Sequence, residues 1–173
     1  MKKGFVFMFL AIIIVFACAF KLGEVKPTLT KKYSNEEVDR MLTSHHLTHS
    51  RDVIPEKILQ DKFTSDFPNA YDIDWEASEN LYEVECEIER TDYKAFYTKE
   101  GELIMYEIDI RKHELPAIVK NVVLQKYPSH KIDDVDKIIK GDGVTYKVEL
   151  DAKRNDLKVF VKEDGTFVKE IPD

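Results

Sequence analysis

The chain has 173 residues, of which 43% are hydrophobic and 34% are charged, a composition that excludes a disordered polymer and is ordinary for a globular protein. Its formal net charge is −7 and its basic residues form no cluster. Nucleic acid as a partner is therefore not expected, because binding to phosphates relies on grouped lysine and arginine. The length allows one domain or two small ones.

The first 19 residues have the pattern of a secretory signal peptide. Two lysines precede an apolar run from residue 4 to residue 20, as in the basic and hydrophobic regions of such signals. Removing residues 1–19 would take away those two lysines and no acidic residue, so the net charge would move from −7 to −9. We therefore expect an exported protein, either periplasmic or secreted.

Three fates of this segment stay open. Ala17 and Ala19 form a small-x-small cleavage site, which would leave Phe20 as the first residue. Residues 15–18 also resemble a bacterial lipobox, in which Cys18 would be lipidated and retained, although Phe16 is large for that pattern. The run is also about as long as a marginal membrane span, so an uncleaved anchor is the third alternative. For the folded protein, the expected membrane attachment is a lipid on Cys18.

Residues 20–51 are expected to form a linker that contains a short helix. Ser34 and Glu37 have the spacing of a capping box, and Val38, Met41 and Leu42 then fall on one face of a helix.

Histidines follow this short helix. His45 and His49 are four residues apart, so on a helix both would point the same way, as zinc ligands do. No third ligand has a fixed spacing to them. A solvated linker is therefore the preferred interpretation, and neither a metal nor another cofactor is expected.

Two helices with matching ends are predicted further along the chain. Pro55 opens the first and Pro116 opens the second, at a position where the missing N–H costs nothing. Each ends in an aromatic residue followed by proline, at Phe67 and Tyr127, because proline disfavours a helical conformation in the residue before it.

The clearest strands lie between residues 82 and 110. Apolar side chains alternate with glutamates along the first of them, which places one set on each face of a sheet; the sets are Tyr82, Val84, Cys86 and Ile88 against Glu83, Glu85, Glu87 and Glu89. Two more strands follow, separated by a turn at Glu100-Gly101. A sheet with one solvent-exposed face and one buried face is typical of an antiparallel meander. Cys86 lies on the apolar side and is expected to be a small buried side chain without a disulfide partner.

The second half of the chain repeats this pattern. The offset is 60 residues between the helix-ending prolines, 62 between Ile73 and Val135, and 64 between Tyr82 and Tyr146. We therefore predict an α+β fold made by tandem duplication of a unit of one helix and four strands, over residues 52–112 and 113–173. The units would join into one antiparallel sheet of about eight strands with both helices packed on one face, and residues 52–173 would act as one domain.

The face opposite the helices is the candidate binding surface. If Thr91 and Asp92 form a two-residue turn, Phe96 stands among carboxylates on this open face, and Phe160 stands there in the second unit. Two exposed aromatic residues would be interface anchors. The competing interpretation is that they support cross-strand packing or that the register differs. The predicted site residues are Phe96, Phe160, Glu85, Glu87 and Lys94.

These residues bear on three classes of function. The first is a non-enzymatic binding module that recognises an unknown protein partner, such as an exported enzyme. The second is a carrier of a small ligand or cation on the acidic face, although carboxylates two apart on a strand are too distant to share one ion readily. The third is an enzyme, which is not expected because no nucleophile is placed beside a base by any motif.

This pattern resembles the PepSY-like family, whose members look like the beta-lactamase inhibitor protein fold. The resemblance rests on residues 52–173 and is most specific at Ile-Asp-Trp-Glu, residues 73–76, with Tyr-Glu-Val-Glu, residues 82–85. Unit two departs from it, since Lys137 stands where Trp75 stands in unit one. The resemblance implies an envelope or secreted protein with no established enzymatic activity, and the related inhibitors bind proteins on the open sheet face. An activity does not transfer with a fold.

Overall fold

A computed structural model describes residues 25–47, 50–141, 143–152 and 156–172 of the chain. The predicted signal peptide, Cys18 and His49 lie outside these residues. Among the described residues, no helix combines the length and apolarity needed to cross a membrane. The division between the two units at residue 113 stays a prediction.

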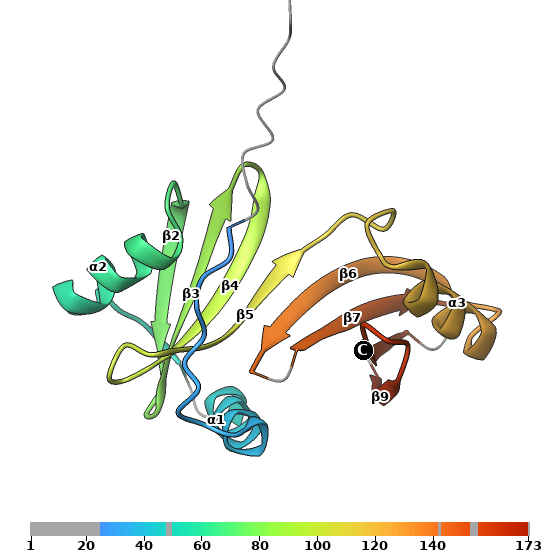
Figure 1. Cartoon of the computed structure of the whole chain (residues 1–173), viewed down its shortest axis with the longest axis horizontal. Coiled ribbons are helices and arrows are strands. Elements are labelled where there is room, and N and C mark those ends of the chain that lie inside the picture. Colours follow the sequence, from blue (N-terminus) through green and yellow to red (C-terminus); the bar gives the residue numbers. More distant parts are fainter. Residues whose placement is uncertain (1–24, 48–49, 142, 153–155, 173) are drawn as a thin grey trace, which may run out of the picture.

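The described chain forms three helices and one sheet of nine strands (Figure 1). The helices are α1 (Asn35–Leu47), α2 (Lys57–Asp66) and α3 (Ala117–Lys126). The strands of the first half are β1 (Arg51–Asp52), β2 (Tyr71–Ala77), β3 (Leu81–Ile88), β4 (Thr91–Thr98) and β5 (Leu103–Asp109). Those of the second half are β6 (Lys131–Lys140), β7 (Gly143–Asp151), β8 (Leu157–Lys162) and β9 (Phe167–Pro172).

The sheet is a single antiparallel meander, and its strands lie side by side in chain order from β1 to β9. The two halves meet where β5 pairs with β6, for example at Tyr106 and Ile139. The predicted α+β fold and its antiparallel sheet are confirmed. The sheet has one strand more than the predicted eight. The additional strand is β1, which is only two residues long and pairs with the end of β2.

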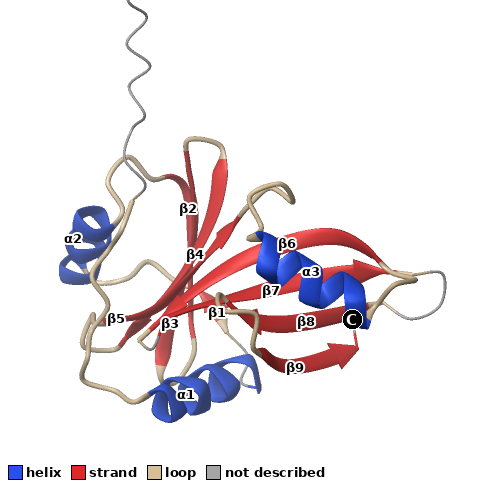
Figure 2. Cartoon of the chain, turned by 45° about the vertical axis from the view of Figure 1, so that its right-hand side comes forward, coloured by secondary structure: helices blue, strands red, loops and turns tan. Residues whose placement is uncertain are grey.

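Helices α2 and α3 pack on the same face of the sheet, as predicted (Figure 2). Leu59 and Phe63 of α2 lie over the Val84 side of the first half, and α3 covers the equivalent Val148 side of the second half. Both helices end at the expected aromatic residues, where the backbone N–H of Phe67 donates to Phe63 and that of Tyr127 donates to Val123. Each half therefore has its own apolar core between a helix and four strands.

The short helix α1 packs on the opposite face, which was expected to be open. Its capping box is present, because the Ser34 N–H donates to the Glu37 carboxylate at 2.8 Å and the Glu37 N–H donates to the Ser34 hydroxyl at 3.3 Å. Val38 of α1 is buried against a separate apolar cluster on this face. The segment described as a linker is thus part of the packed structure.

The turn between β3 and β4 lies two residues earlier than predicted. It consists of Glu89 and Arg90, which have φ angles of 54° and 67°, rather than Thr91 and Asp92. Phe96 consequently pairs with Glu83, and Lys94 pairs with Glu85. A turn at Thr91 and Asp92 would pair Phe96 with Glu87 and Lys94 with Glu89, so each partner is displaced by four residues. An even displacement preserves the face on which each side chain lies, so the predicted faces are correct although these pairs are wrong.

Two further side chains are placed by the structure. Trp75 lies on the helix face, where its ring meets Phe63 edge-on with centroids 5.3 Å apart. Cys86 is a buried free thiol on the same face. Burial raises the pKa of the Cys86 thiol to about 12, so it packs as a small apolar group and is not a nucleophile at neutral pH.

Candidate binding face

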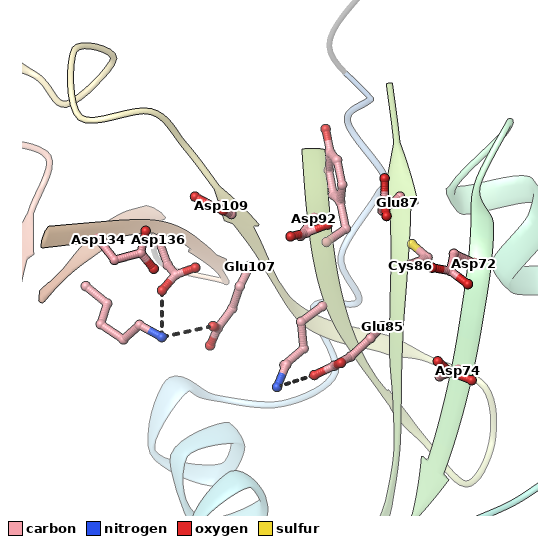
Figure 3. Close-up of a pocket in the computed structure, with 13 residues that line it drawn as sticks. Asp72, Asp74, Glu85, Cys86, Glu87, Asp92, Glu107, Asp109, Asp134 and Asp136 are labelled. Carbon is pink, nitrogen blue, oxygen red and sulfur yellow. Dashed lines mark ion pairs between the residues drawn. The ribbon is translucent and has the colours of Figure 1, made fainter. Parts of the chain in front are cut away.

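The sheet face opposite α2 and α3 contains an acidic hollow of about 470 Å³ (Figure 3). Its lining comes from six neighbouring strands, β2 to β7, and includes nine carboxylates and two lysines. The carboxylates belong to Asp72, Asp74, Glu85, Glu87, Asp92, Glu107, Asp109, Asp134 and Asp136, and the lysines are Lys94 and Lys147. We call this surface the acidic hollow.

The acidic hollow follows from alternation along the strands. Glu85 and Glu87 point away from the apolar core because Val84 and Cys86 point into it. Pairing carries the same face across the sheet, so Lys94 lies opposite Glu85 and Glu107 lies opposite Lys94. The junction of β5 with β6 then adds the acidic residues of the second half. The hollow therefore belongs to both units.

Lys94 is shared between two carboxylates at one side of the hollow. Its Nζ lies 2.9 Å from Glu83 Oε1 and 2.7 Å from Glu85 Oε1. Burial alone would lower the pKa of Lys94, but the hydrogen bonds to Glu85 and Glu83 outweigh burial and raise it. Lys94 is therefore a permanent cation held within the acidic face.

Lys147 has the same role at the other side. Its Nζ lies 2.6 Å from Asp136 Oδ2 and 3.9 Å from Glu107 Oε2 (Figure 3). Burial would lower the pKa of Lys147, and the hydrogen bond to Asp136 with the charges of Asp136 and Glu107 raises it instead. Two lysines cannot neutralise nine carboxylates, so the hollow keeps a strongly negative potential.

Burial and, after it, neighbouring like charges raise the pKa of two acids in the hollow. Burial, followed by the charge of Asp136, raises the pKa of Glu107 above its ordinary value despite the opposing charge of Lys147. Burial raises the pKa of Asp109 as well, with further contributions from Asp134 and Asp136. Both carboxylates would gain from an additional cation in the hollow.

Six carboxylates of the hollow make no ion pair with any other described residue: Asp72, Asp74, Glu87, Asp92, Asp109 and Asp134. Together with the exposed part of Glu85, these are the groups able to pair with an incoming ligand. Of these six carboxylates, only Glu87 is among the site residues predicted from the sequence. The signal was present in the alternating acids of Asp134 and Asp136, but their position beside Asp109 depends on how the two halves join.

One group of acids has the spacing of a metal site. Ligand atoms of Asp134, Asp136 and Glu149 lie within 4.8 Å of one another. The ammonium group of Lys147, however, lies 2.6 Å from Asp136 and 3.9 Å from Glu149. A lysine therefore already supplies the positive charge that a metal ion would bring to these carboxylates.

The predicted site residues divide into two groups. Glu85, Glu87 and Lys94 line the acidic hollow, and their role in binding a partner stays a prediction. Phe96 lies on the same face but is only 1% exposed, so its prediction as a solvent-facing anchor is wrong: α1 covers it. Phe160 is half-buried beside the cluster under α1, and the Lys169 ammonium lies 4.6 Å from its ring centre.

His45 is a buried polar anchor of α1 rather than a surface ligand. It is 3% exposed; its Nε2 lies 2.6 Å from Glu83 Oε2 and its Nδ1 lies 2.8 Å from Ser78 Oγ. Serine, histidine and glutamate are connected here in the order used by hydrolases. Ser78 is nevertheless more than nine-tenths buried under α1, so this chain of hydrogen bonds fixes a helix and presents no nucleophile.

Comparison with known families identifies the relationship that this architecture suggests. The family model described as "Putative beta-lactamase-inhibitor-like, PepSY-like" matches residues 37–105 and again residues 82–169. The chain belongs to the PepSY-like family. Two matches along one chain agree with the tandem duplication. The first match begins at residue 37, within α1, and so extends beyond the residues on which the resemblance rested.

Solved structures share the fold of this PepSY-like protein. A DUF2874 family protein from Bacteroides uniformis has a TM-score of 0.64 at 15% identity, covering 69% of this chain and 90% of its own. A BLIP-like protein from Bacteroides fragilis has a TM-score of 0.62 at 19% sequence identity, and the match covers 69% of this chain and 87% of that protein. A protein from Bacteroides eggerthii described among "putative periplasmic proteins" has a TM-score of 0.65 at 14% sequence identity, and the match covers 69% of this chain and 90% of that protein. A comparison with curated proteins finds no match.

Proposed function

We propose that this protein is an exported, non-enzymatic binding module that holds a basic segment of a partner protein in its acidic hollow. The observation that carries the proposal is the concentration of nine carboxylates against two lysines on one hollowed sheet face. Complementary charge on a partner would make binding fast and specific. The PepSY-like family, with its beta-lactamase-inhibitor-like description, supports a protein as the ligand.

The width of the hollow favours a polypeptide over a single ion. Neighbouring strands are about 4.8 Å apart, so the five strands β2 to β6 spread the carboxylates over roughly 19 Å. A row of lysine or arginine side chains can engage charges at this spacing, and one metal ion cannot. An exported enzyme with a basic patch, such as a peptidase that the module would inhibit, fits this description.

Capture experiments with matched charge variants test the proposal. The hollow variant carries Asp92→Asn, Asp109→Asn and Asp134→Asn, and the control removes three exposed acids elsewhere, at Asp61, Glu79 and Glu163. Each exposed ion pair contributes about 0.2–1 kcal/mol, so the hollow variant should bind a partner roughly 3-fold to 100-fold more weakly than the wild type.

We expect the wild type and the control to retain a basic partner from a cell-envelope extract at low salt, and the hollow variant to lose it. Capture should weaken as salt is added. A partner retained by the hollow variant would contradict the proposal. Absence of any partner, with calcium or zinc raising the unfolding temperature of the wild type, would instead support the alternative of a cation carrier.

A further inference from the structure

Helix α1 occupies the part of the binding face that lies next to the acidic hollow. Beneath it is an apolar patch made by four strands; the members are Leu81, Phe96, Ile104, Met105 and Ile138. Ile138 belongs to the second half of the sheet and the other four to the first, so α1 lies across the junction of the halves (Figure 1). We call this surface the covered patch.

The attachment of α1 is more polar than that of the other two helices. Helices α2 and α3 each bury two apolar residues and end in a buried aromatic residue, whereas α1 buries one apolar residue, Val38. Met41 and Leu42 are only partly buried against the same cluster. The polar contacts of the helix include those of His45 with Ser78 and Glu83, of Ser44 with Asn80 at 3.3 Å, and of Asp39 with Lys140 at 2.7 Å. A helix of 13 residues is marginal once it leaves its contacts.

A chain of polar contacts connects α1 to the acidic hollow. Glu83 accepts from His45 through Oε2 and contacts Lys94 through Oε1, and Lys94 in turn contacts Glu85 in the hollow. If α1 leaves, Glu83 loses its histidine partner and adds a carboxylate to the hollow, while the covered patch becomes accessible beside it. The face then offers an apolar groove for a helix next to an acidic groove for basic side chains.

We propose that α1 is a displaceable cover, which a partner replaces with an amphipathic helix of its own while its basic residues enter the acidic hollow. Docked α1 shows what the groove accepts: apolar residues at positions 38, 41 and 42 and a hydrogen-bonding side chain at 45. Docking of α1 and binding of such a partner exclude each other, so weakening α1 strengthens the partner. This inference rests on the proposed function.

Two probes separate the groove from the hollow. The first is decalysine, a basic peptide without apolar side chains for the groove, which is expected to bind in the hollow alone. The second, the bipartite probe, joins a peptide with the sequence of residues 34–47 to decalysine through a flexible linker, so that both grooves are engaged together. Each is titrated against the full folded chain, as the wild type and as His45→Ala, which removes the contacts of the helix with Ser78 and Glu83.

The bipartite probe should bind His45→Ala at least about ten-fold more tightly than the wild type, because α1 is docked in a smaller fraction of the variant molecules. Decalysine should gain less, at most the contribution of the one carboxylate, Glu83, that undocking adds to the hollow, which is about 1.4-fold to 5-fold. Exchange of the α1 backbone amides in the wild type should become faster when the bipartite probe is added. Val38→Ser is a second variant with the same expected direction, and unfolding by urea verifies that both variants are folded.

Equal binding of the bipartite probe to the wild type and to both variants, with unchanged α1 exchange, would overturn the inference. Decalysine keeps this result distinct from failure of the proposed function. If decalysine binds the wild type but not the hollow variant, the hollow is a binding site whatever α1 does. If decalysine does not bind the wild type, the proposed function fails, and the inference fails with it.

Discussion

Phe96 provides a sharp test of the role of α1, because an exposed anchor and a buried core residue respond differently to truncation. The side chain is 1% exposed and packs in the cluster under α1, and its ring meets His45 edge-on with centroids 5.8 Å apart. Phe96→Ala should therefore cost about 3–5 kcal/mol in the free energy of unfolding. For a chain of this size, the midpoint of thermal unfolding should fall by roughly 10 °C.

Phe160→Ala is the matched control. Phe160 is half-buried beside the same cluster and is covered on one side by Lys169, so its truncation should cost about 1–2 kcal/mol. Urea unfolding followed by far-UV circular dichroism measures both variants. In a double-mutant cycle, Phe96→Ala and His45→Ala should couple by about 0.5–1.5 kcal/mol through their ring contact. A loss below about 1 kcal/mol for Phe96→Ala would mean that α1 does not cover this face.

Three more predictions follow from particular side chains. Because burial raises the folded-state pKa of Glu107, the stability that its protonated form provides is present below the unfolded pKa and is lost as pH rises through the folded pKa. Glu107→Gln should therefore be more stable than wild type at pH 7, with the gain vanishing below about pH 4, as urea titrations at both pH values would reveal; an equal gain at both would refute the assignment. The Cys86 thiol, with its pKa of about 12, should react with a maleimide only after denaturation, and rapid labelling of the native protein would contradict its burial. Gly165 has φ +88°, and a Cβ there would lie 3.0 Å from Ile118, so Gly165→Ala should cost more than about 1 kcal/mol by thermal unfolding, from backbone strain and this close contact together; a variant as stable as the wild type would contradict both.

Alternation was sufficient to assign side chains to faces. The positions of Glu85, Glu87 and Lys94 on the binding face follow from period-two patterning and survive an error of two residues in the turn. The turn itself was misplaced because Glu89 and Arg90 adopt positive φ angles without the glycine or asparagine that usually signals such a turn.

The alternation of polar and apolar residues does not predict contacts between segments that are distant in the sequence. The sequence indicates a short amphipathic helix near Val38 but carries no signal for the face on which it docks, so the burial of Phe96 could not be foreseen. The same limit applies to Glu107 and Lys147, which come together only because β5 pairs with β6 across the two units. The parts of the site that one strand defines were predictable, and the parts that several strands share were not.

The most direct test of the acidic hollow as a binding site is to map decalysine on the protein by backbone amide chemical shifts. The account predicts that the shifts concentrate at Asp92, Asp109 and Asp134 and their neighbours on the same face, and that they disappear in the variant with asparagine at these three positions. Shifts of equal size at exposed acids elsewhere, such as Asp61 and Glu163, would show that the peptide responds only to net charge and would contradict the account.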